Sequence, residues 1–260
     1  MVEDFSKYKV LILAAGFGTR LQPFTKEVPK VMVPIWNGRP LLEHTLLLLR
    51  SQGFRDFVIN LHYLPHKIVE HFGDGSRFGV CITYSDETKQ LLDTAGAIKK
   101  VEPLLSNHFL LLYGDMLHFL DFRSVVSFHE ARRALATVVL SRTIEPHCAD
   151  IVCVETGSNR ILEWYKRPHE IRAFEGELFA NSGLYVLSKK ILGHIAPGKA
   201  VKLDADVIPS LVHVNTNLFG FPASDEIFDI GTIEKYNLAR QWYEGRLDRS
   251  PLVDFSHHDT

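Results

Sequence analysis

An apolar run that ends in small residues and glycine constrains this chain more than any other feature. The run Val10–Leu13 predicts a buried strand, and the sequence AAGFGTR follows it at positions 14–20. Small side chains there let backbone N–H groups approach a ligand without interference from Cβ atoms. Arg20 and Lys30 supply the positive charge that a polyphosphate needs. The segment therefore predicts a nucleotide-binding loop after the first strand.

Two better-known glycine motifs do not fit this segment. The dinucleotide fingerprint would need a small residue at position 21, which is Leu21. The phosphate-binding P-loop would place a lysine directly after its last glycine, whereas Lys30 lies farther along the chain. Prolines at positions 23, 29 and 34 disfavour a long helix after the loop. A tight turn without a ligand is the alternative for the glycines alone, but the cations and prolines favour an irregular loop that wraps phosphates.

Composition favours a soluble enzyme with one domain. The chain has 260 residues, of which 46% are hydrophobic and 23% are charged, and its formal net charge is -2. This charge gives no global basic field, so we expect no nucleic-acid partner. Cys81, Cys148 and Cys153 lack zinc spacing to any histidine, and we interpret them as reduced thiols of a cytoplasmic protein. No run approaches the roughly 18 apolar residues of a membrane span, so we expect no membrane partner.

Strand-like and helix-like runs alternate through the first half of the chain. The expected strands are Val10–Leu13, Phe57–Leu61, Val80–Tyr84, Phe109–Tyr113 and Ala136–Leu140. This alternation predicts an α/β fold with a mainly parallel central sheet. Ligands of such sheets lie beyond the carboxyl ends of the strands. The glycine loop and Gly114-Asp115 both follow strand ends, so we expect them at one edge of the sheet.

The second half of the chain has strand-like runs with only short spacers. Ile151–Glu155, Ile161–Tyr165 and Leu178–Leu187 predict an antiparallel extension. The expected helices lie at 41–49, where His44 reads as structural, near 204–212 and at 232–243. We expect one domain over 1–260, with a nucleotide-binding half at 1–149, an acceptor-binding half at 150–245 and a loose tail at 246–260. No hexapeptide repeat follows residue 245, which argues against a C-terminal β-helix.

The glycine loop and five later segments resemble the sugar-phosphate nucleotidyltransferases, also called nucleotide-sugar pyrophosphorylases. The segments are LAAGFGTRLQPFT at 13–25, FGDGSRFG at 72–79, DTAG at 93–96, GD at 114–115, NSGLY at 181–185 and FDIGT at 228–232. They occur in the family's order and span almost the whole chain. The resemblance implies a Rossmann-like nucleotidyltransferase fold. It also implies transfer of a nucleoside monophosphate from a nucleoside triphosphate to a sugar 1-phosphate, with release of pyrophosphate.

The implied reaction joins two anions and needs little side-chain chemistry. Because the attacking phosphate oxygen is already ionised, positioning and electrostatic stabilisation dominate over general-base catalysis. By resemblance, Arg20 would bind the β- and γ-phosphates and Lys30 would lie near the α-phosphate, as the two catalytic cations. A surface lysine is the alternative for Lys30. The candidate nucleotide-binding residues are Leu13, Ala14, Ala15, Gly16, Gly18, Thr19 and Gly96, where Gly96 matches the family's base-and-ribose loop.

Two aspartates that end apolar runs are the candidate metal ligands. Asp115 follows the expected strand at 109–113, and Asp229 follows Ile227 and Phe228 in what we expect to be a similar setting. Two carboxylates at one edge would hold Mg²⁺, with water and phosphate oxygens completing the octahedron. By resemblance, these positions are the metal-binding aspartates of the family. The alternative for each is a turn or the cap of a following helix.

The candidate acceptor-binding residues lie in the second half. Asn181 and Gly183 match the sugar-contacting segment of the family, although a strand bulge is the alternative. Where many relatives have Glu-Lys-Pro, this chain has Lys166, Arg167 and Pro168. Arg167 can bind phosphate in a bidentate manner, but it is not a neutral exchange for lysine. The lost carboxylate leaves the identity of the acceptor open.

The base and the functional class also have alternatives. The small residues at 14–16 favour UTP, whereas the segments at 72–79 and 179–185 favour the mannose or heptose guanylyltransferase branch. A cytidylyltransferase for a non-sugar phosphate is the nearest competing enzyme, and a noncatalytic nucleotide-binding regulatory subunit is the competing binding protein. A glycosyltransferase would need an Asp-x-Asp motif where this chain has Asp115, Met116 and Leu117. By analogy with the family alone, we expect a homo-oligomer.

Overall fold

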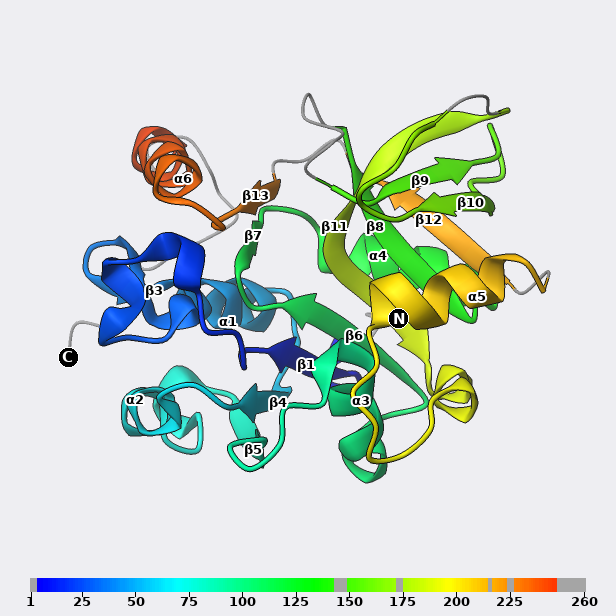
Figure 1. Ribbon diagram of the computed structural model, residues 1–260. Helices are drawn as coiled ribbons and strands as arrows, with labels where there is room; N and C mark the ends of the chain where they lie inside the picture. The colour runs from blue at the N-terminus through cyan, green and yellow to red at the C-terminus, as the bar shows by residue number, and fades with distance from the viewer. Residues whose placement is uncertain (1–3, 143–148, 172–174, 215–216, 224–226, 247–260) are drawn as a thin grey trace.

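A mixed sheet covered by helices on both faces forms the centre of the computed structural model (Figure 1). The structure describes residues 4–142, 149–171, 175–214, 217–223 and 227–246. Cys148 lies outside these ranges, as does the tail predicted at 246–260, except for residue 246, which ends a helix. The predicted α/β class is confirmed, because a block of parallel strands that reaches one edge of the sheet continues into antiparallel strands on its other side.

Four strands form the parallel region of the sheet. They are β1 (Lys9–Leu13), β4 (Asp56–Leu61), β5 (Cys81–Asp86) and β6 (His108–Tyr113). β1 pairs in parallel with both β4 and β6, and β4 pairs in parallel with β5. These are four of the predicted strands, with ends shifted by one or two residues. Apolar runs in β1, β4 and β6 are buried on both faces, as is typical of parallel sheets.

Five strands form the antiparallel region. They are β8 (Ala136–Ser141), β9 (Ile151–Val154), β10 (Ile161–Tyr165), β11 (Glu177–Ser188) and β12 (Leu218–Pro222). β11 runs antiparallel to β6, β8 and β9, so the predicted antiparallel extension is confirmed. β8 differs from the expectation of a strand in the parallel set, because its only parallel neighbour is β12 within the described residues. An apolar run predicts burial but does not reveal the direction of the neighbouring strand.

Side chains alternate between two cores along the strands. In β1, Val10 and Ile12 belong to one apolar cluster and Leu11 to the other, as the period of two in a strand dictates. The first cluster is covered by α1 (Leu41–Ser51), α2 (Pro65–Phe72) and α4 (Phe122–Ala131). The second is covered by α3 (Asp93–Lys100) and α5 (Ile208–Val212). The predicted helices at 41–49 and near 204–212 are confirmed.

A third apolar cluster joins the last helix to the segment after the glycine loop. The elements are α6 (Ile233–Arg246), the strand pair β2 (Pro34–Trp36) and β3 (Arg39–Pro40), and the pair β7 (Met116–His118) and β13 (Ile227–Asp229). The Tyr243 hydroxyl lies 2.8 Å from Nδ1 of His44. Burial lowers the pKa of His44 to about 4, so this histidine is a neutral structural residue, as predicted.

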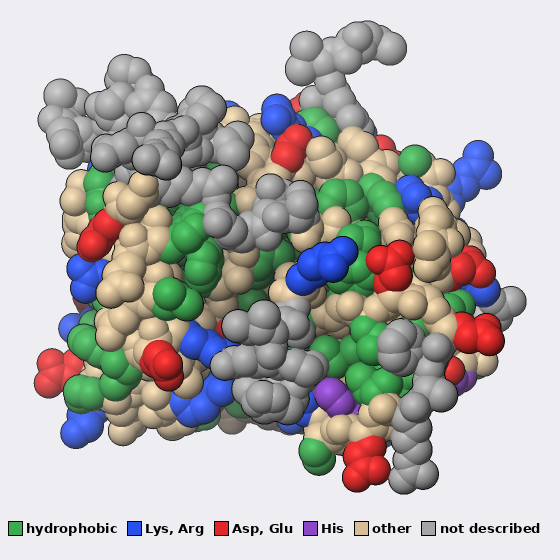
Figure 2. Space-filling model, turned by 90° about the horizontal axis from the view of Figure 1, so that it is seen from above, with side chains coloured by type: hydrophobic (Ala, Val, Ile, Leu, Met, Phe, Trp, Pro, Cys, Tyr) green, Lys and Arg blue, Asp and Glu red, His purple; other side chains and the backbone are tan. Residues whose placement is uncertain are grey.

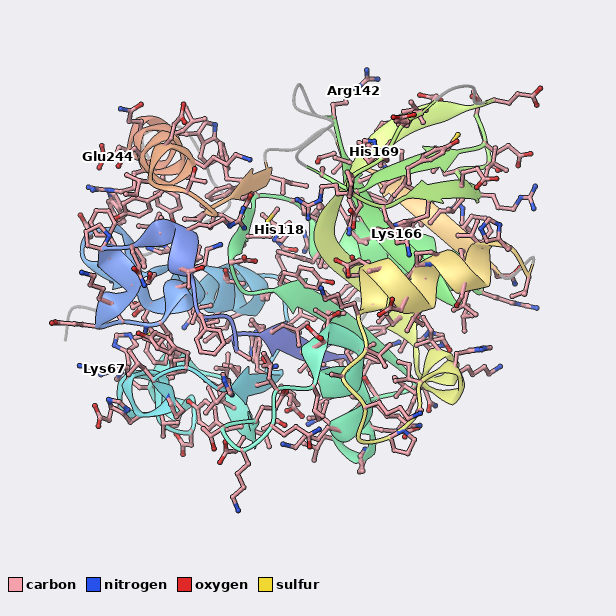
Figure 3. The ribbon with its side chains drawn as sticks, viewed as in Figure 1. Lys67, His118, Arg142, Lys166, His169 and Glu244 are labelled. Carbon is pink, nitrogen blue, oxygen red and sulfur yellow. The ribbon has the colours of Figure 1, made fainter. Side chains whose placement is uncertain are left out.

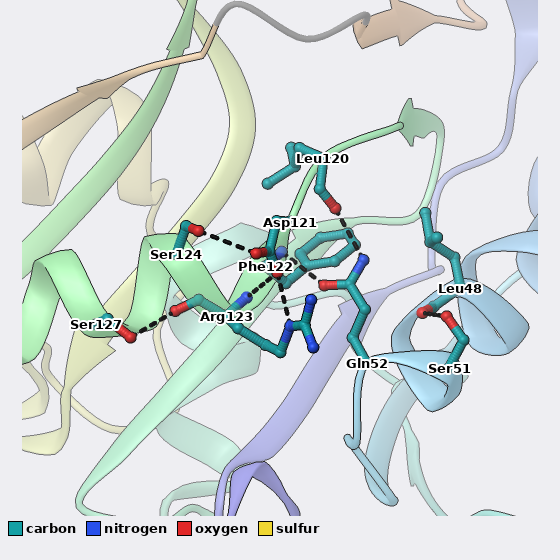
Figure 4. A network of polar contacts seen from close by, with 9 residues as sticks. All are labelled: Leu48, Ser51, Gln52, Leu120, Asp121, Phe122, Arg123, Ser124 and Ser127. Atoms are coloured by element: carbon teal, nitrogen blue, oxygen red, sulfur yellow. Dashed lines mark hydrogen bonds and ion pairs between the residues drawn. The ribbon is translucent and has the colours of Figure 1, made fainter. Parts of the chain in front are cut away.

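Short helical turns complete the chain. Single 3₁₀ helices lie at 5–7, 19–21, 24–26, 30–32, 76–78, 102–104 and 189–194, and a π-helical turn at 203–207 leads into α5. Gln52 fixes the end of α1 to the start of α4 (Figure 4). Its Nε2 donates to the Leu120 carbonyl at 2.9 Å, and its Oε1 accepts from the Phe122 N–H at 2.7 Å. Because both ends of this buried amide are bonded, the two helices keep one relative position.

The outer surface carries both signs of charge. Figure 2, which views the molecule from above, shows basic and acidic side chains interspersed over that face. This distribution agrees with the net charge of -2. None of the helices in the described residues has the length and apolar character needed to cross a membrane.

Candidate active site

A cavity of about 440 Å³ lies at the carboxyl ends of β1 and β6. Its lining residues are Leu13, Ala14, Ala15, Gly16, Phe17, Gly18, Thr19, Arg20, Lys30, Val31, Asn60, Leu91, Asp93, Thr94, Tyr113, Asp115 and Gly231. The structure therefore brings together both predicted cations, Asp115 and every predicted nucleotide-binding residue except Gly96. Small-molecule sites commonly have this size, and this edge of the sheet is where parallel strands present ligands.

Gly18 shapes the loop that follows β1. Its φ angle of 65° lies in the left-handed region, which glycine adopts without strain. An added Cβ would lie 2.9 Å from Cβ of Lys30 and 3.0 Å from Cγ2 of Thr25. The Thr25 hydroxyl also donates to the Gly18 carbonyl at 2.8 Å. Glycine is thus required for the close approach of Lys30, and short turns replace a long helix here, as the prolines predicted.

A buried polar chain that sequence analysis missed holds the loop in place. Asn60 Oδ1 accepts from the Ala14 N–H at 2.6 Å, and Asn60 Nδ2 donates to Glu87 Oε1 at 2.9 Å. Glu87 Oε2 in turn accepts from the Leu92 N–H at 3.1 Å. Both side chains are at most 3% exposed. An asparagine within the apolar run of β4 was the available signal, since a buried amide needs partners.

The two predicted cations occupy different environments in the cavity. Lys30 is 6% exposed, and its Nζ donates to Asp115 Oδ2 at 2.7 Å, so the surface-lysine alternative is wrong. Arg20 is exposed at the cavity wall, and its guanidinium has no hydrogen-bond or ion-pair partner among the described residues. A held ammonium and an unpaired guanidinium offer complementary positive charge to a polyphosphate.

The backbones of the two predicted metal ligands adjoin through a small sheet rather than through the central one, and Asp229, unlike Asp115, does not line the cavity. Asp229 ends β13 and pairs with Met116 of β7, and the Ile230 N–H donates to the Asp115 carbonyl at 3.1 Å. The sequence predicted that Asp229 follows a buried strand, as Asp115 does. This prediction is wrong, because β13 is a three-residue, half-buried strand. Gly231 lines the cavity, and an added Cβ there would lie 2.8 Å from Asp229 Oδ1.

Both aspartates offer oxygen donors of the type that magnesium binds. Asp115 Oδ2 bonds Lys30, and Asp229 Oδ2 lies 3.6 Å from Nζ of Lys235. Both carboxylates are partly exposed, at 38% and 35%, and each keeps an oxygen outside these ion pairs. No group of three or more metal-binding side chains occurs among the described residues. Two carboxylates suit Mg²⁺ when substrate phosphates and water supply the other oxygens.

Gly96 lies outside the lining of the cavity. An added Cβ would meet the Lys199 carbonyl oxygen at 2.3 Å, and the Gly96 N–H donates to the Val201 carbonyl at 3.3 Å. Because Gly96 has no side chain, the backbone of residues 199–201 can pack directly against α3. The resemblance placed Gly96 beside the nucleoside, but in this structure the packing of that segment accounts for the glycine.

Asn181 and Gly183 form a bulge in β11. Asn181 pairs with Leu140 of β8, and Tyr185 pairs with Val138. β11 therefore uses four residues where β8 uses two. Asn181 Nδ2 donates to the Tyr185 hydroxyl at 2.7 Å, and its Oδ1 accepts from the Gly183 N–H at 3.1 Å. The bulge that was the alternative for this segment is therefore present. Neither residue lines the cavity described above.

Arg167 lies in the antiparallel region and also does not line the cavity. Its side chain is about half exposed, and its Nε is 3.3 Å from Asp150 Oδ1. Asp150 also accepts from the Arg167 N–H at 3.0 Å. Burial, and then the charge of Asp150, raises the pKa of the Asp204 carboxyl in the turn before α5. The predicted acceptor residues thus belong to a polar cluster of their own.

His118 connects the two regions near these groups (Figure 3). Its Nε2 donates to the Ser182 carbonyl at 2.9 Å, which links β7 to the bulge of β11. The side chain is 3% exposed, and Nδ1 has no partner in the described residues. Burial lowers the pKa of His118 to about 4, so the imidazole is neutral at physiological pH. Figure 3 also shows Lys166 and His169 on the side of the antiparallel region.

Known proteins share both the sequence pattern and the fold of this chain. The family model described as nucleotidyl transferase matches residues 9–245. The chain belongs to this nucleotidyl transferase family. The structure therefore presents the family's fold with the cavity, the cations and the two aspartates described above.

The relatives with curated names differ in the base that their names specify. UTP–glucose-1-phosphate uridylyltransferase of Synechocystis sp. is 33% identical over 240 residues, which are 88% of this chain and 61% of that protein. Mannose-1-phosphate guanyltransferase of Saccharomyces cerevisiae is 31% identical over 228 residues, 86% of this chain and 61% of that protein. This chain thus spans 61% of the length of each of these two relatives.

Solved structures share the fold at lower identity. A Bacillus anthracis protein assigned as a glucose-1-phosphate thymidylyltransferase, in complex with a sucrose, has a TM-score of 0.79 and 23% identity. That match covers 90% of this chain and 94% of the other. HddC from Yersinia pseudotuberculosis, complexed with GMP-PN, has a TM-score of 0.74 and 23% identity, and the match covers 91% of this chain and 99% of HddC.

Proposed function

We propose that this chain transfers a nucleoside monophosphate from a nucleoside triphosphate to a sugar 1-phosphate and releases pyrophosphate. One observation carries the proposal. The glycine loop after β1, the exposed Arg20 and the ion pair of buried Lys30 with partly exposed Asp115 all line one cavity at the carboxyl end of the parallel region. The names of the curated relatives support sugar 1-phosphates as the acceptor class.

The reaction needs the two anionic substrates held together. In-line attack by a phosphate oxygen of the acceptor forms a new bond to the α-phosphorus, and the bond to the departing pyrophosphate breaks. Two unit charges at 4 Å repel by about 4 kcal/mol at an effective dielectric of about 20. Arg20 and Lys30 offset this repulsion, and backbone N–H groups of the glycine loop bind phosphate oxygens. No side chain has to remove a proton from the attacking group.

Asp115 and Asp229 would hold a magnesium ion in this reaction. The ion would neutralise charge on the phosphates that complete its coordination. Lys30 and Lys235 orient the two carboxylates before the substrate arrives. The exposed Arg167, beside Asp150, is our candidate for the acceptor phosphate. Asn181 and Gly183 are the candidates for the sugar, at the bulge that His118 fixes to β7.

Pyrophosphate release in the presence of Mg²⁺ tests the proposal. The assay pairs each of five nucleoside triphosphates with a panel of sugar 1-phosphates and with phosphocholine. Asp115→Asn is the test variant. Asp74→Asn is the matched control, because Asp74 is exposed in the loop after α2 and asparagine can still accept from the Ser76 N–H. The proposal predicts release that needs one triphosphate and one sugar 1-phosphate, is lost in Asp115→Asn and persists in the control.

Two other results would point elsewhere. Release with phosphocholine but with no sugar 1-phosphate would favour the cytidylyltransferase for a non-sugar phosphate. Nucleotide binding without release from any pair would favour the noncatalytic regulatory subunit. Either result would overturn the proposed reaction while leaving the nucleotide cavity in place.

A further inference from the structure

Asp150 is a nearly buried carboxylate among the candidate acceptor residues. It directly precedes β9, and the strand register places it opposite Lys166, after β10, on one side and opposite Asn181 of β11 on the other. The Asn181 N–H donates to the Asp150 carbonyl at 2.9 Å. Only 11% of the Asp150 side chain is exposed. The carboxylate therefore lies between the segment of Arg167 and the bulge of β11.

One oxygen of this carboxylate is left for a ligand. Oδ1 accepts from the N–H of Arg167 at 3.0 Å and from its Nε at 3.3 Å. Oδ2 has no hydrogen bond to any residue in the part of the chain that the structure describes. A carboxylate oxygen that is largely removed from water needs a donor. A bound substrate can supply the donor that the described side chains do not.

The neighbouring candidates offer few acceptors of their own. Asn181 uses its Nδ2 on the Tyr185 hydroxyl and its Oδ1 on the Gly183 N–H. Gly183 has no side chain, and Arg167 carries donors only. A sugar 1-phosphate has an anionic group, which a cation can bind, and several hydroxyl groups, which need acceptors. Asp150 is therefore the member of this group best suited to accept from a sugar hydroxyl.

A second carboxyl group lies close to the first. Burial, and then the charge of Asp150, raises the pKa of Asp204 in the turn before α5. Burial chiefly raises the pKa of Tyr185, and the charges of Asp204 and Asp150 add to that rise. These mutual influences mean that the two carboxyl groups and the Tyr185 hydroxyl are neighbours. A cluster rich in oxygen acceptors beside a guanidinium matches the two kinds of group on a sugar phosphate.

We propose that Oδ2 of Asp150 accepts a hydrogen bond from a hydroxyl of the sugar 1-phosphate and selects acceptors that carry this hydroxyl. The inference rests on the proposed function. Arg167, bonded to the other oxygen of the same carboxylate, would lie beside the acceptor phosphate. The chain lacks the glutamate that many relatives have at position 166, and Asp150 supplies a carboxylate opposite that position. Hydrogen bonds to a carboxylate are among the stronger ones, so one missing hydroxyl should have a measurable effect.

A purely structural role, in which Asp150 only holds Arg167 in place, is the competing explanation. Loss of the carboxylate charge would then displace the guanidinium and weaken every ligand that carries a phosphate. If Asp150 binds a hydroxyl instead, loss of that charge releases Arg167 from an ion pair. Inorganic phosphate should then inhibit as well as before or better, while the sugar 1-phosphate binds more weakly.

Pyrophosphate release with altered acceptors separates the two explanations. The acceptors are glucose 1-phosphate, mannose 1-phosphate and their 2-, 3-, 4- and 6-deoxy analogues, and inorganic phosphate serves as the inhibitor. The chains are the wild type, Asp150→Asn, Asp150→Ala and the matched control Glu163→Gln, which changes an exposed carboxylate on β10. Asparagine keeps the shape of aspartate and can still accept from the Arg167 N–H, so the fold is retained.

The expected result is a preference for one hydroxyl. In the wild type and the control, kcat/KM should be about 10- to 100-fold higher for the complete acceptor than for one of its deoxy analogues. Both Asp150 variants should lose most of that preference, and inorganic phosphate should inhibit Asp150→Asn at least as strongly as it inhibits the wild type.

Four results would overturn the inference. A wild type that uses every deoxy analogue within threefold of the complete acceptor does so without any variant. A preference that persists in both Asp150 variants assigns the hydroxyl to another group. Equal weakening of inorganic phosphate and of all acceptors in Asp150→Asn leaves Asp150 with the structural role alone. In these three cases the proposed transfer stands, whereas a chain that releases no pyrophosphate with any sugar 1-phosphate overturns both proposals together.

Discussion

The predicted site residues at the strand ends of the parallel region line the cavity, whereas those of the antiparallel region do not. In the parallel region, the glycine loop, Lys30 and Asp115 line one cavity at the strand ends. In the antiparallel region, Arg167 bonds Asp150 and Asn181 bonds Tyr185, outside the lining of that cavity. The first region leaves a space for a ligand, whereas the two residues of the second contact neighbouring side chains. Under the proposed function, an acceptor bound by Arg167 would compete with Asp150 for that guanidinium.

The largest effect should come from the buried cation of the parallel region. Lys30→Met removes the only charge that Asp115 bonds directly among the described residues and deletes positive charge near the reacting phosphate. We expect kcat/KM for pyrophosphate release to fall by about 100- to 1,000-fold, a range typical of a lost electrostatic contact. Lys26→Met, at an exposed lysine of the same segment, is the control. A kcat/KM of Lys30→Met within threefold of the wild-type value would contradict the electrostatic role of Lys30.

Metal dependence should show the next largest effect. Asp229→Asn removes one of two oxygen donors from the small sheet of β7 and β13, so the variant should need roughly 10- to 100-fold more Mg²⁺ for half-maximal release. Chelation by EDTA should abolish release in the wild type. The measurement is the rate against free Mg²⁺ concentration, with Asp74→Asn beside it. An unchanged Mg²⁺ requirement in Asp229→Asn would assign the metal to other ligands.

The contact between the regions should make folding stability depend on pH. Burial gives His118 a pKa of about 4 in the fold, against an ordinary value of 6.5, so the unfolded chain binds more protons between these two pH values. Stability is therefore fully present above about pH 6.5 and falls as the pH drops toward 4. This histidine alone should contribute a loss of about 2 kcal/mol in the free energy of unfolding between about pH 7.5 and about pH 5.

His118→Gln tests this contribution. Glutamine can still donate to the Ser182 carbonyl but does not titrate, so the loss measured by urea unfolding at the two pH values should shrink by about 2 kcal/mol. His194→Gln, at an exposed histidine, should leave the pH dependence unchanged. If the free energy of unfolding of both variants falls between the two pH values by the same amount as in the wild type, His118 does not contribute to the pH dependence of stability.

The smallest effect should come from Arg167. Its ion pair with Asp150 is half exposed, and such pairs contribute little to stability. Arg167→Ala should raise the KM for the sugar 1-phosphate by about 3- to 10-fold and leave the KM for the triphosphate unchanged. Arg20→Ala is the matched variant, and it should raise the KM for the triphosphate and leave the KM for the sugar 1-phosphate unchanged. A rise in the KM for the triphosphate in Arg167→Ala would contradict the assignment of the acceptor to the antiparallel region and of the triphosphate to the parallel region.

Local sequence predicted the features that one segment determines by itself. The apolar runs of β1, β4 and β6 specify buried parallel strands, and the residues that follow two of them meet at one edge because parallel strands share an edge. The prolines after the glycine loop likewise excluded a long helix. The resemblance to a known family added the roles, and the match over residues 9–245 confirmed the family.

Features that depend on two distant segments escaped prediction. Asn60 and Glu87 join the glycine loop to Leu92 through hydrogen bonds that no local pattern reveals. Asp229 meets Asp115 through a three-residue strand too short to show a period. Gly96 is explained by the backbone of residues 199–201, about a hundred positions away. Tertiary contacts, rather than local propensity, decide these positions.

A crystal structure with Mg²⁺ and a nonhydrolysable nucleoside triphosphate would show directly which residues bind the phosphates. We expect triphosphate oxygens on the N–H groups of the glycine loop and on Lys30, with Asp115 and Asp229 on the metal. Arg167 should stay beside Asp150 in that complex, because the acceptor is absent. A triphosphate bound outside the cavity, or one whose phosphates contact Arg167 instead of Lys30, would contradict the account.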